Sequence, residues 1–456
     1  MEIKIDVLVA EIGSTTTVVN AFDGIGKDPV FVGSGQAPTT VQSGDVRDGL
    51  ARAMESLAKN LGAASVGYGK MLAASSAAGG LRMSVHGLVY DMTARAGREA
   101  ALGAGANIQM TTAGLLDPLD IAMLERAAPN LVLLAGGTDY GERETAAKNA
   151  EALAASRLSA PVIYCGNAQN AERVRMVFGL AGKKLYVTEN VYPRLDELNV
   201  EPVRRLIHRA FEEHITEAPG MAHVRDMVTG SIIPTPGAVM EAAKLLRESI
   251  GDALVVDVGG ATTDVHSVSE GSEEMLRMAI SPEPFAKRTV EGDLGVYVNA
   301  APLAAAIGHE KIAAALGLPL AALEAALAEY RPIPETAAQF AITSFLAEHA
   351  AAVAIRRHAG RLRHTFVASG RKTWAEGKDL TKVKWLVATG GALTRLPARG
   401  EILGRLTGLN ENGELLYPAP GSMSVLEDSS YIMAALGVLS LEHREDAKKL
   451  AEKELF

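Results

Sequence analysis

The sequence predicts an α/β protein in which one strand–turn–strand motif occurs twice. In the first copy, an apolar strand over 5–10 runs through a Gly/Ser/Thr turn into a second strand that starts near Val18. The second copy lies about 245 residues later, where the apolar run 253–258 passes through a Gly/Ala/Thr turn into 265–268. Between 120 and 190, strand and helix patterns alternate, which predicts a parallel sheet with right-handed crossovers.

The other elements are predicted from the spacing of apolar residues. A helix is expected over 45–61, where apolar residues recur at helical spacing. The alternating middle segment has strands at 130–135, 161–164 and 184–187, with helices at 142–158 and 168–180. The second half has helices at 236–248, 302–330 and 336–362, a strand at 384–389 and a helix from Ser430 onward.

Composition excludes several classes of protein. With 48% apolar and 22% charged residues in 456, the chain can bury real cores, so disorder of the whole chain is excluded. The 45 basic and 54 acidic residues give a net charge of −9, which argues against a general nucleic-acid binder. A single cysteine, Cys165, cannot form an intramolecular disulfide or supply the thiolates of an iron–sulfur cluster. We therefore expect a reduced, intracellular protein.

The sequence also argues against a membrane protein. No segment approaches the ~20 uninterrupted apolar residues that a membrane span needs. Charged residues at Glu2, Lys4 and Asp6 stand where a secretory signal would place its apolar core. We expect a cytoplasmic location.

Two acidic residues, Glu11 and Asp257, each end an apolar strand and are followed by glycines and threonines. Glycines let the backbone approach a ligand closely, so that backbone amides can hold phosphate oxygens. A carboxylate beside such a loop would repel phosphate unless Mg²⁺ lies between them, and Mg²⁺ keeps much of its water while accepting a few carboxylates. Two opposed loops of this kind indicate a clamp around a magnesium–nucleotide.

Each of these patterns is ordinary by itself. A Gly-Gly pair after a strand is usually a tight turn, and Ser and Thr are common turn residues. Their order carries the argument: acid-x-Gly-Ser-Thr first, Asp-x-Gly-Gly-x-Thr-Thr-Asp midway, and strand-Gly-Gly-x-Leu at Gly390 and Gly391. Other nucleotide and metal signatures, such as G-x-x-x-x-G-K-[ST], G-x-G-x-x-G after a strand and H-E-x-x-H, are absent from the sequence.

The three motifs in this order resemble the actin/heat-shock-70/sugar-kinase fold, in which two ribonuclease-H-like lobes (βββαβα) close around magnesium–ATP. Residues 11–17 are similar to its first phosphate loop, 257–264 to its second and 389–393 to its adenosine motif. The resemblance implies a two-lobed actin-like ATPase fold with an inserted α/β segment. The expected domains are a first lobe over 1–250 with the insertion at about 115–220, a second lobe over 251–425, and a C-terminal helix over 426–456 that returns to the first lobe.

A narrower resemblance is to the glutamate mutase accessory protein family, also called MutL and unrelated to the mismatch-repair protein of that name. It is carried by Leu8-Val9-Ala10-Glu11-Ile12-Gly13-Ser14-Thr15-Thr16-Thr17, Asn20-Ala21-Phe22, Gln36-Ala37-Pro38-Thr39-Thr40-Val41, Leu133-Leu134-Ala135-Gly136-Gly137-Thr138-Asp139 and Arg288-Thr289-Val290-Glu291-Gly292-Asp293-Leu294-Gly295. The family is associated with adenosylcobalamin-dependent mutases such as glutamate (methylaspartate) mutase. The resemblance implies an ATP-driven chaperone that reactivates such a mutase.

The resemblance also implies roles for individual residues. Mg²⁺ and its waters would be held by Glu11, Asp257 and Asp264. The phosphates would be held by Gly13, Ser14, Thr15, Thr16, Gly259, Gly260, Ala261 and Thr262, with Gly390 and Gly391 under the adenosine. A base that orients water would be Asp257, Asp264 or Asp293, with Asp257 preferred. Because Glu11 stands where the wider fold usually has Asp, binding of ATP is a safer expectation than its hydrolysis.

Other functions stay open on the sequence alone. An ATP-dependent hydantoinase or acetone-carboxylase type of enzyme has a similar loop at 257–265, although its chains are typically longer and need His/Asp metal clusters. A sugar kinase would need a catalytic carboxylate that the sequence does not mark, and a dehydratase activator would need cysteines for an iron–sulfur cluster. An actin-type filament former would need a polymer interface that nothing marks. The identity of the mutase and the oligomeric state, a homodimer included, are also left open.

Overall fold

In the computed structural model, the chain forms two compact units. The described residues are 2–13, 16–41, 44–77, 80–214, 220–331, 333–367, 370–410 and 412–456. Unit 1 comprises Met1–Ala242 and Ala434–Leu450, and unit 2 comprises Ala243–Met433 and Ala451–Phe456. Three helices each contain a boundary between the units: α8 (Thr235–Ile250), α16 (Met433–Ser440) and α17 (Arg444–Leu455).

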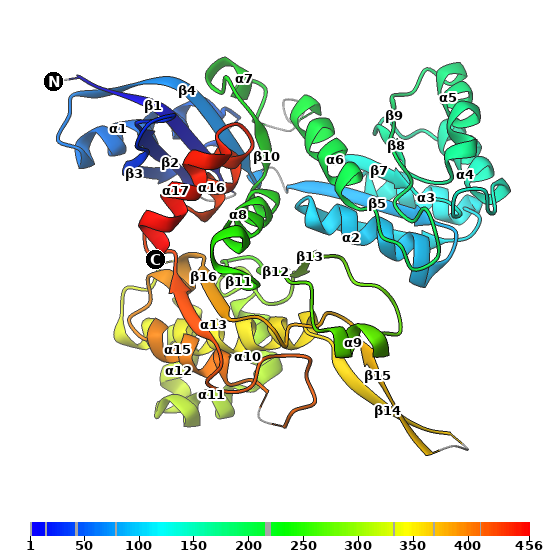
Figure 1. The fold of residues 1–456 in the computed structure, drawn as a ribbon. Coiled ribbons are helices and arrows are strands. Elements are labelled where there is room, and N and C mark those ends of the chain that lie inside the picture. Colours follow the sequence, from blue (N-terminus) through cyan, green and yellow to red (C-terminus); the bar gives the residue numbers. More distant parts are fainter. Residues whose placement is uncertain are drawn as a thin grey trace. The chain divides into compact units, whose positions relative to one another are not determined.

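Unit 1 is built on a five-stranded sheet in the order β10-β4-β1-β2-β3. The first three strands form an antiparallel meander, and β4 and β10 add to it in parallel. The strands are β1 (Glu2–Ile12), β2 (Thr16–Asp23), β3 (Val30–Pro38), β4 (Ser65–Ser75) and β10 (Ile232–Pro234). Helix α1 (Val46–Asn60) follows the meander (Figure 1). It buries Val46, Leu50 and Leu57, as their helical spacing predicts.

A second sheet, all parallel, is inserted into unit 1 between β4 and β10, in the order β6-β5-β7-β8-β9. The predicted strands are confirmed as β7 (Leu131–Leu134), β8 (Val162–Tyr164) and β9 (Leu185–Val187). Two further strands, β5 (Leu81–Gly87) and β6 (Ala106–Ala113), join them and were not predicted.

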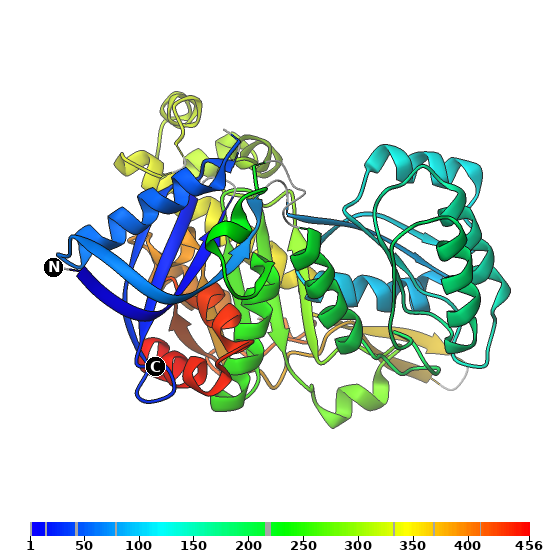
Figure 2. The ribbon, with the colours of Figure 1, turned by 90° about the horizontal axis from the view of Figure 1, so that it is seen from above.

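Helices cover both faces of the inserted sheet (Figure 2). Successive residues of β7 pack on opposite faces: Leu133 lies in one core with Ala100 of α2, and Leu134 in another with Leu153 of α4. This alternation is the pleat of a strand buried on both sides. The helical elements are η3 (Tyr90–Ala94), α2 (Arg95–Gly103), α3 (Pro118–Ala127), α4 (Glu144–Ala155), η4 (Ala168–Asn170), α5 (Ala171–Leu180), α6 (Glu201–His214) and α7 (Val224–Met227).

Unit 2 repeats the strand order of unit 1, as β13-β12-β11-β16-β17. Its first three strands again form an antiparallel meander, with the last two parallel to the first. The strands are β11 (Ala253–Val258), β12 (Thr263–Val268), β13 (Ala286–Glu291), β16 (Trp385–Thr389) and β17 (Ser424–Glu427). Two lobes with the same ribonuclease-H-like order confirm the predicted actin-like ATPase fold.

The helices of unit 2 include one that is long and apolar. Helix α13 (Ala337–His358) has the length and composition to cross a membrane. However, half of its most apolar stretch is buried inside the protein, and Ile342, Leu346 and Ala350 lie in the core of unit 2. Helix α13 is therefore a core helix of unit 2, packed against the sheet that contains β11 and β12. The other helices are α9 (Glu273–Met278), α10 (Ala300–Ile307), α11 (His309–Leu316), α12 (Leu320–Ala328), α14 (Gly391–Thr394) and α15 (Arg399–Thr407). The predicted helix at 336–362 instead ends at His358 and is followed by a hairpin of β14 (Arg361–Val367) and β15 (Gly370–Glu376).

The inserted sheet contains a buried histidine that makes its stability depend on pH. His86 of β5 is held by hydroxyl groups at both ring nitrogens, Thr112 Oγ1 at 2.8 Å and Ser84 Oγ at 3.1 Å. Burial lowers the pKa of His86 from 6.5 to about 4. Between these values the unfolded state binds more protons than the folded state, so stability falls as the pH falls.

We therefore expect the free energy of unfolding to drop by up to about 1.4 kcal/mol per pH unit below about pH 6.5 because of His86. Urea unfolding at pH 7, 6 and 5 gives the pH dependence of the free energy of unfolding for wild type and for His86→Gln. The difference between the two dependences is the contribution of His86. Equal slopes in the two proteins would show that His86 makes no such contribution.

Candidate functional site

The first candidate loop lies in unit 1, between β1 and β2. The hairpin is closed by the Gly13 N–H, which donates to the Thr16 carbonyl at 3.0 Å. A Cβ added at Gly13 would lie 2.7 Å from the Thr16 oxygen, so this close approach favours glycine. Glu11, two residues before the closing glycine, pairs with Val18 across the strands. Ser14 and Thr15, which the sequence analysis placed on the phosphates, lie outside the described residues.

The second candidate loop, in unit 2, has the same construction. The Gly259 N–H donates to the Thr262 carbonyl at 2.9 Å and closes the hairpin of β11 and β12. Asp257 stands two residues before the glycine, as Glu11 does in the first loop, and pairs with Asp264 across the strands. The sequence repeat is therefore a structural repeat, with the acid, the glycine and the closing threonine at equal spacing.

The segment that follows β13 holds the second loop in place. The Val296 N–H donates to the Gly259 carbonyl at 3.2 Å, and the Val298 N–H donates to the Gly260 carbonyl at 2.7 Å. Asn299 Nδ2 donates to the Ala261 carbonyl at 2.8 Å. Three successive carbonyl oxygens, which would repel phosphate, are thus turned toward residues 296–299.

Asp264 is committed to partners inside unit 2. Its Oδ1 accepts from Arg288 Nε at 2.8 Å, and its Oδ2 accepts from Thr262 Oγ1 at 3.0 Å. Both members of the ion pair are buried, with Arg288 only 1% exposed. Asp264 therefore fixes the Thr262 hydroxyl of the loop, and its carboxylate does not fit a role as a direct metal ligand.

Gly390 brings a third stretch of backbone against Asp257. Strand β16 runs parallel to β11 with Thr389 beside Asp257, and Gly390 follows with φ of 84°. A Cβ built on Gly390 would lie 2.3 Å from Asp257 Oδ1, whereas one on Gly391 would meet no atom within 4 Å. Gly390 is thus required for packing, while Gly391 presents open backbone that a ligand can approach.

A cavity of about 520 Å³ opens beside the segment that follows α14. Its wall is mostly apolar, and the Glu348–Arg405 ion pair, with an Nε–Oε1 distance of 2.6 Å, stands at it. The lining residues are Ala315, Leu316, Phe340, Ala341, Ser344, Phe345, Glu348, Pro397, Ala398 and Arg405. An apolar cavity with aromatic walls and few polar groups suits a flat heterocyclic group.

Asp293 is held by an arginine. Arg357 Nη1 lies 3.1 Å from Asp293 Oδ1 and 2.5 Å from Glu291 Oε2. The hydrogen bond from Arg357 lowers the pKa of Asp293, whereas burial raises the pKa of Glu291. Asp293 is therefore an anion stabilised by a paired cation, which makes it a weak base.

Sequence reasoning missed one further carboxylate, Asp428, which follows β17. Its side chain accepts from Thr389 Oγ1 at 2.9 Å and from the N–H groups of Ile432 and Met433 at 2.8 and 3.0 Å. Asp428 is fully buried, and burial raises its pKa. It ties the end of β16, next to Gly390, to the start of α16. Only its place after a strand could have marked it in the sequence.

No group of three or more His, Cys, Asp or Glu with metal-binding spacing occurs among the residues that the structure describes. This geometry does not suit a structural or catalytic zinc site in those residues. Mg²⁺ is a different case, because it keeps several waters and needs only one or two carboxylates beside a phosphate. A single acid at each loop, Glu11 and Asp257, fits that requirement.

Comparison with known proteins assigns the family. The family model described as MutL protein matches residues 7–455. The chain belongs to the MutL family, the glutamate mutase accessory proteins. The curated Protein MutL of Clostridium tetanomorphum is 36% identical over 461 residues, covering 98% of each chain.

Solved structures are more distantly similar to this MutL family member. A nucleotide-free acetone carboxylase matches 96% of this chain and 70% of its own, at 16% identity and a TM-score of 0.43. Xylulose kinase from Bifidobacterium adolescentis matches 98% and 94%, at 13% identity and a TM-score of 0.31. A glycerol dehydratase reactivase matches 94% and 99%, at 11% identity and a TM-score of 0.27. These similarities are weak, and the fold assignment rests on the strand order of the two sheets.

The contrast between the two glycines gives a test. Gly390→Ala should lower the free energy of unfolding by at least about 2 kcal/mol, because it combines a positive φ with a collision against Asp257 and the Val258 backbone. Gly391→Ala should change it by less than about 0.5 kcal/mol. Urea unfolding of the two variants measures both effects, and equal losses would contradict the placement of Gly390.

The buried ion pair between Arg288 and Asp264 gives a second test. Arg288→Met leaves the Asp264 carboxylate without its cation and should cost about 3–5 kcal/mol of stability. Arg288→Met/Asp264→Asn should recover a large part of that loss, because the buried group then carries no charge. A single variant as stable as wild type, again by urea unfolding, would mean that the pair is not buried as the structure describes.

Proposed function

We propose that this protein is an ATP-hydrolysing chaperone that reactivates an adenosylcobalamin-dependent mutase such as glutamate mutase. The observation that carries the proposal is the paired construction of the two hairpin loops, each with an acid two residues before a closing glycine, in a chain of the MutL family. A repeated acid–glycine–threonine loop supports binding of a magnesium–nucleotide, and the family supports a mutase as the partner. We also propose a cytoplasmic location.

In this proposal the loop backbones hold the phosphates. The Gly259–Thr262 loop suits this role because its carbonyls are occupied by residues 296–299. Gly391 would lie under the adenosine with its open backbone, and the cavity at Pro397 and Ala398, in the segment that follows α14, would take the base. The full set of proposed binding residues is Gly13, Ser14, Thr15, Thr16, Gly259, Gly260, Ala261, Thr262, Gly390 and Gly391.

The carboxylates have different roles in this proposal. Glu11 and Asp257 would hold Mg²⁺ through its waters, and the ion when bound would neutralise charge on the phosphates. Asp257 would orient the water that attacks, because it stands at the end of β11, two residues before the glycine that closes the second loop. Asp264 would act indirectly by positioning the Thr262 hydroxyl. Loss of the γ-phosphate would then bias a two-state closure that acts on the mutase.

The direct test is release of ADP from magnesium–ATP by the purified protein, with and without glutamate mutase that carries inactivated cobalamin. Turnover stimulated severalfold by the inactivated mutase, and not by fresh holoenzyme, is the expected result. Turnover that ignores the mutase but responds to a small carbonyl substrate would favour the hydantoinase or acetone-carboxylase type of enzyme. No binding of either ATP or the mutase would contradict the proposal.

The proposed roles of the two aspartates are separable. Asp257→Asn should lower kcat for ATP hydrolysis by at least about 100-fold, the usual range for loss of a positioned base, without loss of stability. Asp293→Asn is the matched control, because it removes an equal charge from a carboxylate held by Arg357, and it should change kcat by less than about tenfold. A steady-state ADP-release assay measures both, and a reversed order would move the base to Asp293.

A further inference from the structure

The hairpin of β14 and β15 is set apart from the sheets of both units. It forms a two-stranded sheet of its own and extends from the body of unit 2 (Figure 1). Isolated two-stranded hairpins are at best marginally stable in water, because one pair of strands buries little apolar surface. An ordered hairpin that is exposed on most of its length therefore needs an anchor at its base and a reason to be retained.

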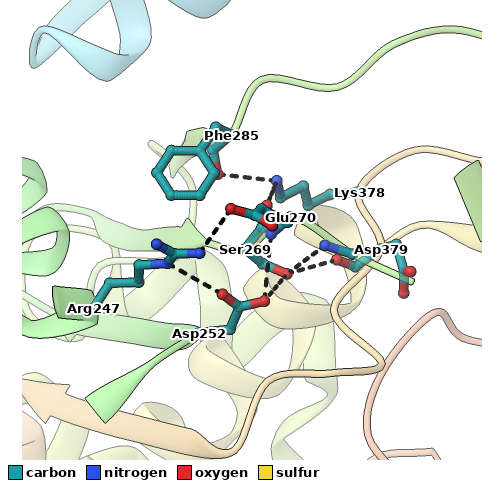
Figure 3. Close-up of polar contacts among 8 residues, drawn as sticks. Arg247, Asp252, Ser269, Glu270, Phe285, Lys378 and Asp379 are labelled. Atoms are coloured by element: carbon teal, nitrogen blue, oxygen red, sulfur yellow. Dashed lines mark hydrogen bonds and ion pairs between the residues drawn. The ribbon is translucent and has the colours of Figure 1, made fainter. Parts of the chain in front are cut away.

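The anchor is a buried polar network just after β15 (Figure 3). Lys378 is 3% exposed, and its Nζ donates to the carbonyls of Ser269 and Pro284, both at 2.7 Å. Asp379 Oδ2 accepts from the Ser272 N–H at 2.6 Å and from Ser272 Oγ at 3.0 Å. The base of the hairpin is thereby fixed to the segment 269–285 of unit 2.

The same network continues to helix α8. Asp252 Oδ2 accepts from Ser269 Oγ at 3.0 Å, and Arg247 Nη2 donates to Glu270 Oε1 at 2.9 Å. The Arg247 guanidinium also lies over the Phe285 ring, 4.9 Å from its centroid. The hairpin of β14 and β15 is thus an arm whose base is fixed on unit 2.

The two strands of this arm carry more basic than acidic residues. Arg361, Arg363, Arg371 and Lys372 stand against one acid, Glu376, in a chain whose net charge is −9. Arg363 pairs with Glu376. Arg371 and Lys372 are exposed, and neither has an acidic partner within 4 Å among the residues that the structure describes. The arm therefore presents uncompensated positive charge on a protein that is acidic as a whole.

An aromatic side chain lies within this charge. Trp374, one of only two tryptophans, pairs with Arg363 across the strands, and Lys372 Nζ lies 3.9 Å from the centroid of its ring. Its indole N–H donates to Thr365 Oγ1 at 3.1 Å, which fixes the ring on the hairpin face. Basic residues alone could serve to prevent edge-to-edge aggregation. A partly buried tryptophan does not serve that purpose, and Trp with Arg is typical of binding hot spots.

Apolar side chains flank the arm. Helix α9 and the residues after it run beside β15, where the Ile280 N–H donates to the Ala375 carbonyl at 3.0 Å. Leu276 is 61% exposed and Ile280 is 54% exposed. A basic, aromatic face next to exposed aliphatic residues matches the composition of protein–protein interfaces, where apolar anchors lie within a polar rim.

We propose that the β14–β15 hairpin is the docking arm for an acidic face of the partner protein. Charge complementarity selects the chemistry of that face, since the arm is a basic feature of an acidic chain and would steer an acidic surface toward it. Nucleic acid is the less suitable anion. Its binding depends on neutralising many phosphates with Lys and Arg, and the arm offers about three uncompensated cations while the net charge of the chain repels a polyanion.

The proposal rests on the proposed function only in taking the mutase as the partner, so two probes are used with the full-length protein. The first is a poly-L-glutamate peptide, which tests the arm by itself, and the second is inactivated glutamate mutase. The arm variant is Arg371→Glu/Lys372→Glu. Its control, Lys27→Glu/Arg52→Glu, makes the same change in net charge at exposed residues of unit 1. Trp374→Ala removes the aromatic ring without a change in charge.

At 50 mM salt, we expect the arm variant to weaken binding of both probes at least about tenfold and the control by less than about twofold. The difference should shrink at 500 mM salt, where exposed charges are screened. Trp374→Ala should weaken the mutase complex and leave poly-L-glutamate nearly unaffected. Intact binding by the arm variant, or equal losses in both double variants, would overturn the proposal.

Two further outcomes keep the hypotheses apart. If wild type binds poly-L-glutamate through the arm but does not bind the mutase, the mutase partner is wrong and the acidic docking arm stands. If a single-stranded DNA oligonucleotide of equal charge binds through the arm more tightly than poly-L-glutamate, the arm serves nucleic acid and the docking proposal is overturned.

Discussion

Closure of a hairpin by one backbone hydrogen bond, from a glycine N–H to a threonine carbonyl, is the constraint on which the proposed site depends. The bond forms between Gly13 and Thr16 in unit 1 and between Gly259 and Thr262 in unit 2, at 3.0 and 2.9 Å. Because strand register is rigid, this closure also fixes the acid two residues earlier at the end of its strand. The same glycine–threonine hydrogen bond thus closes the hairpin in both sheets. The two loops differ in the residues that surround them.

In unit 2 those surroundings include several buried charges. Asp264 is neutralised by Arg288, Asp428 accepts three hydrogen bonds, and Lys378 donates to backbone carbonyls. Buried charges add little net stability when paired, but loss of one partner is costly. They therefore specify one arrangement of the second loop, of β16 and of the hairpin base. Rigid supports of this kind suit a site in which backbone groups must meet a ligand without rearrangement.

Much of the fold could be predicted because its signal is local. The two hairpins, helix α1 and strands β7–β9 follow from apolar periodicity and turn residues. Strand β5 could not be found this way, because Ser84 and His86 are polar yet fully buried, where they bond to each other and His86 bonds to Thr112. Hydropathy assigns such residues to the surface, and only the tertiary partners explain their burial.

Dependence on partners that are distant in the sequence also limits prediction of the site. The acids and glycines of the loops stand out in the sequence, whereas Arg288, Asn299 and Asp428 act through partners 24 to 39 residues away. The β14–β15 hairpin was missed because the helical pattern of the preceding segment was continued into its first strand. Its helix-forming neighbours in α13 extended the helical pattern past the true end at His358.

A structure of the full-length protein with Mg²⁺, ADP and beryllium fluoride would test most directly whether the repeated hairpins bind a magnesium–nucleotide. We expect backbone amides of both the 13–16 and the 259–262 loops within hydrogen-bond distance of the phosphate groups, with Glu11 and Asp257 contacting waters of the metal and Gly391 beneath the adenosine. A nucleotide bound at another surface, without contact to these loops, would contradict the central claim that the repeated hairpins bind a magnesium–nucleotide.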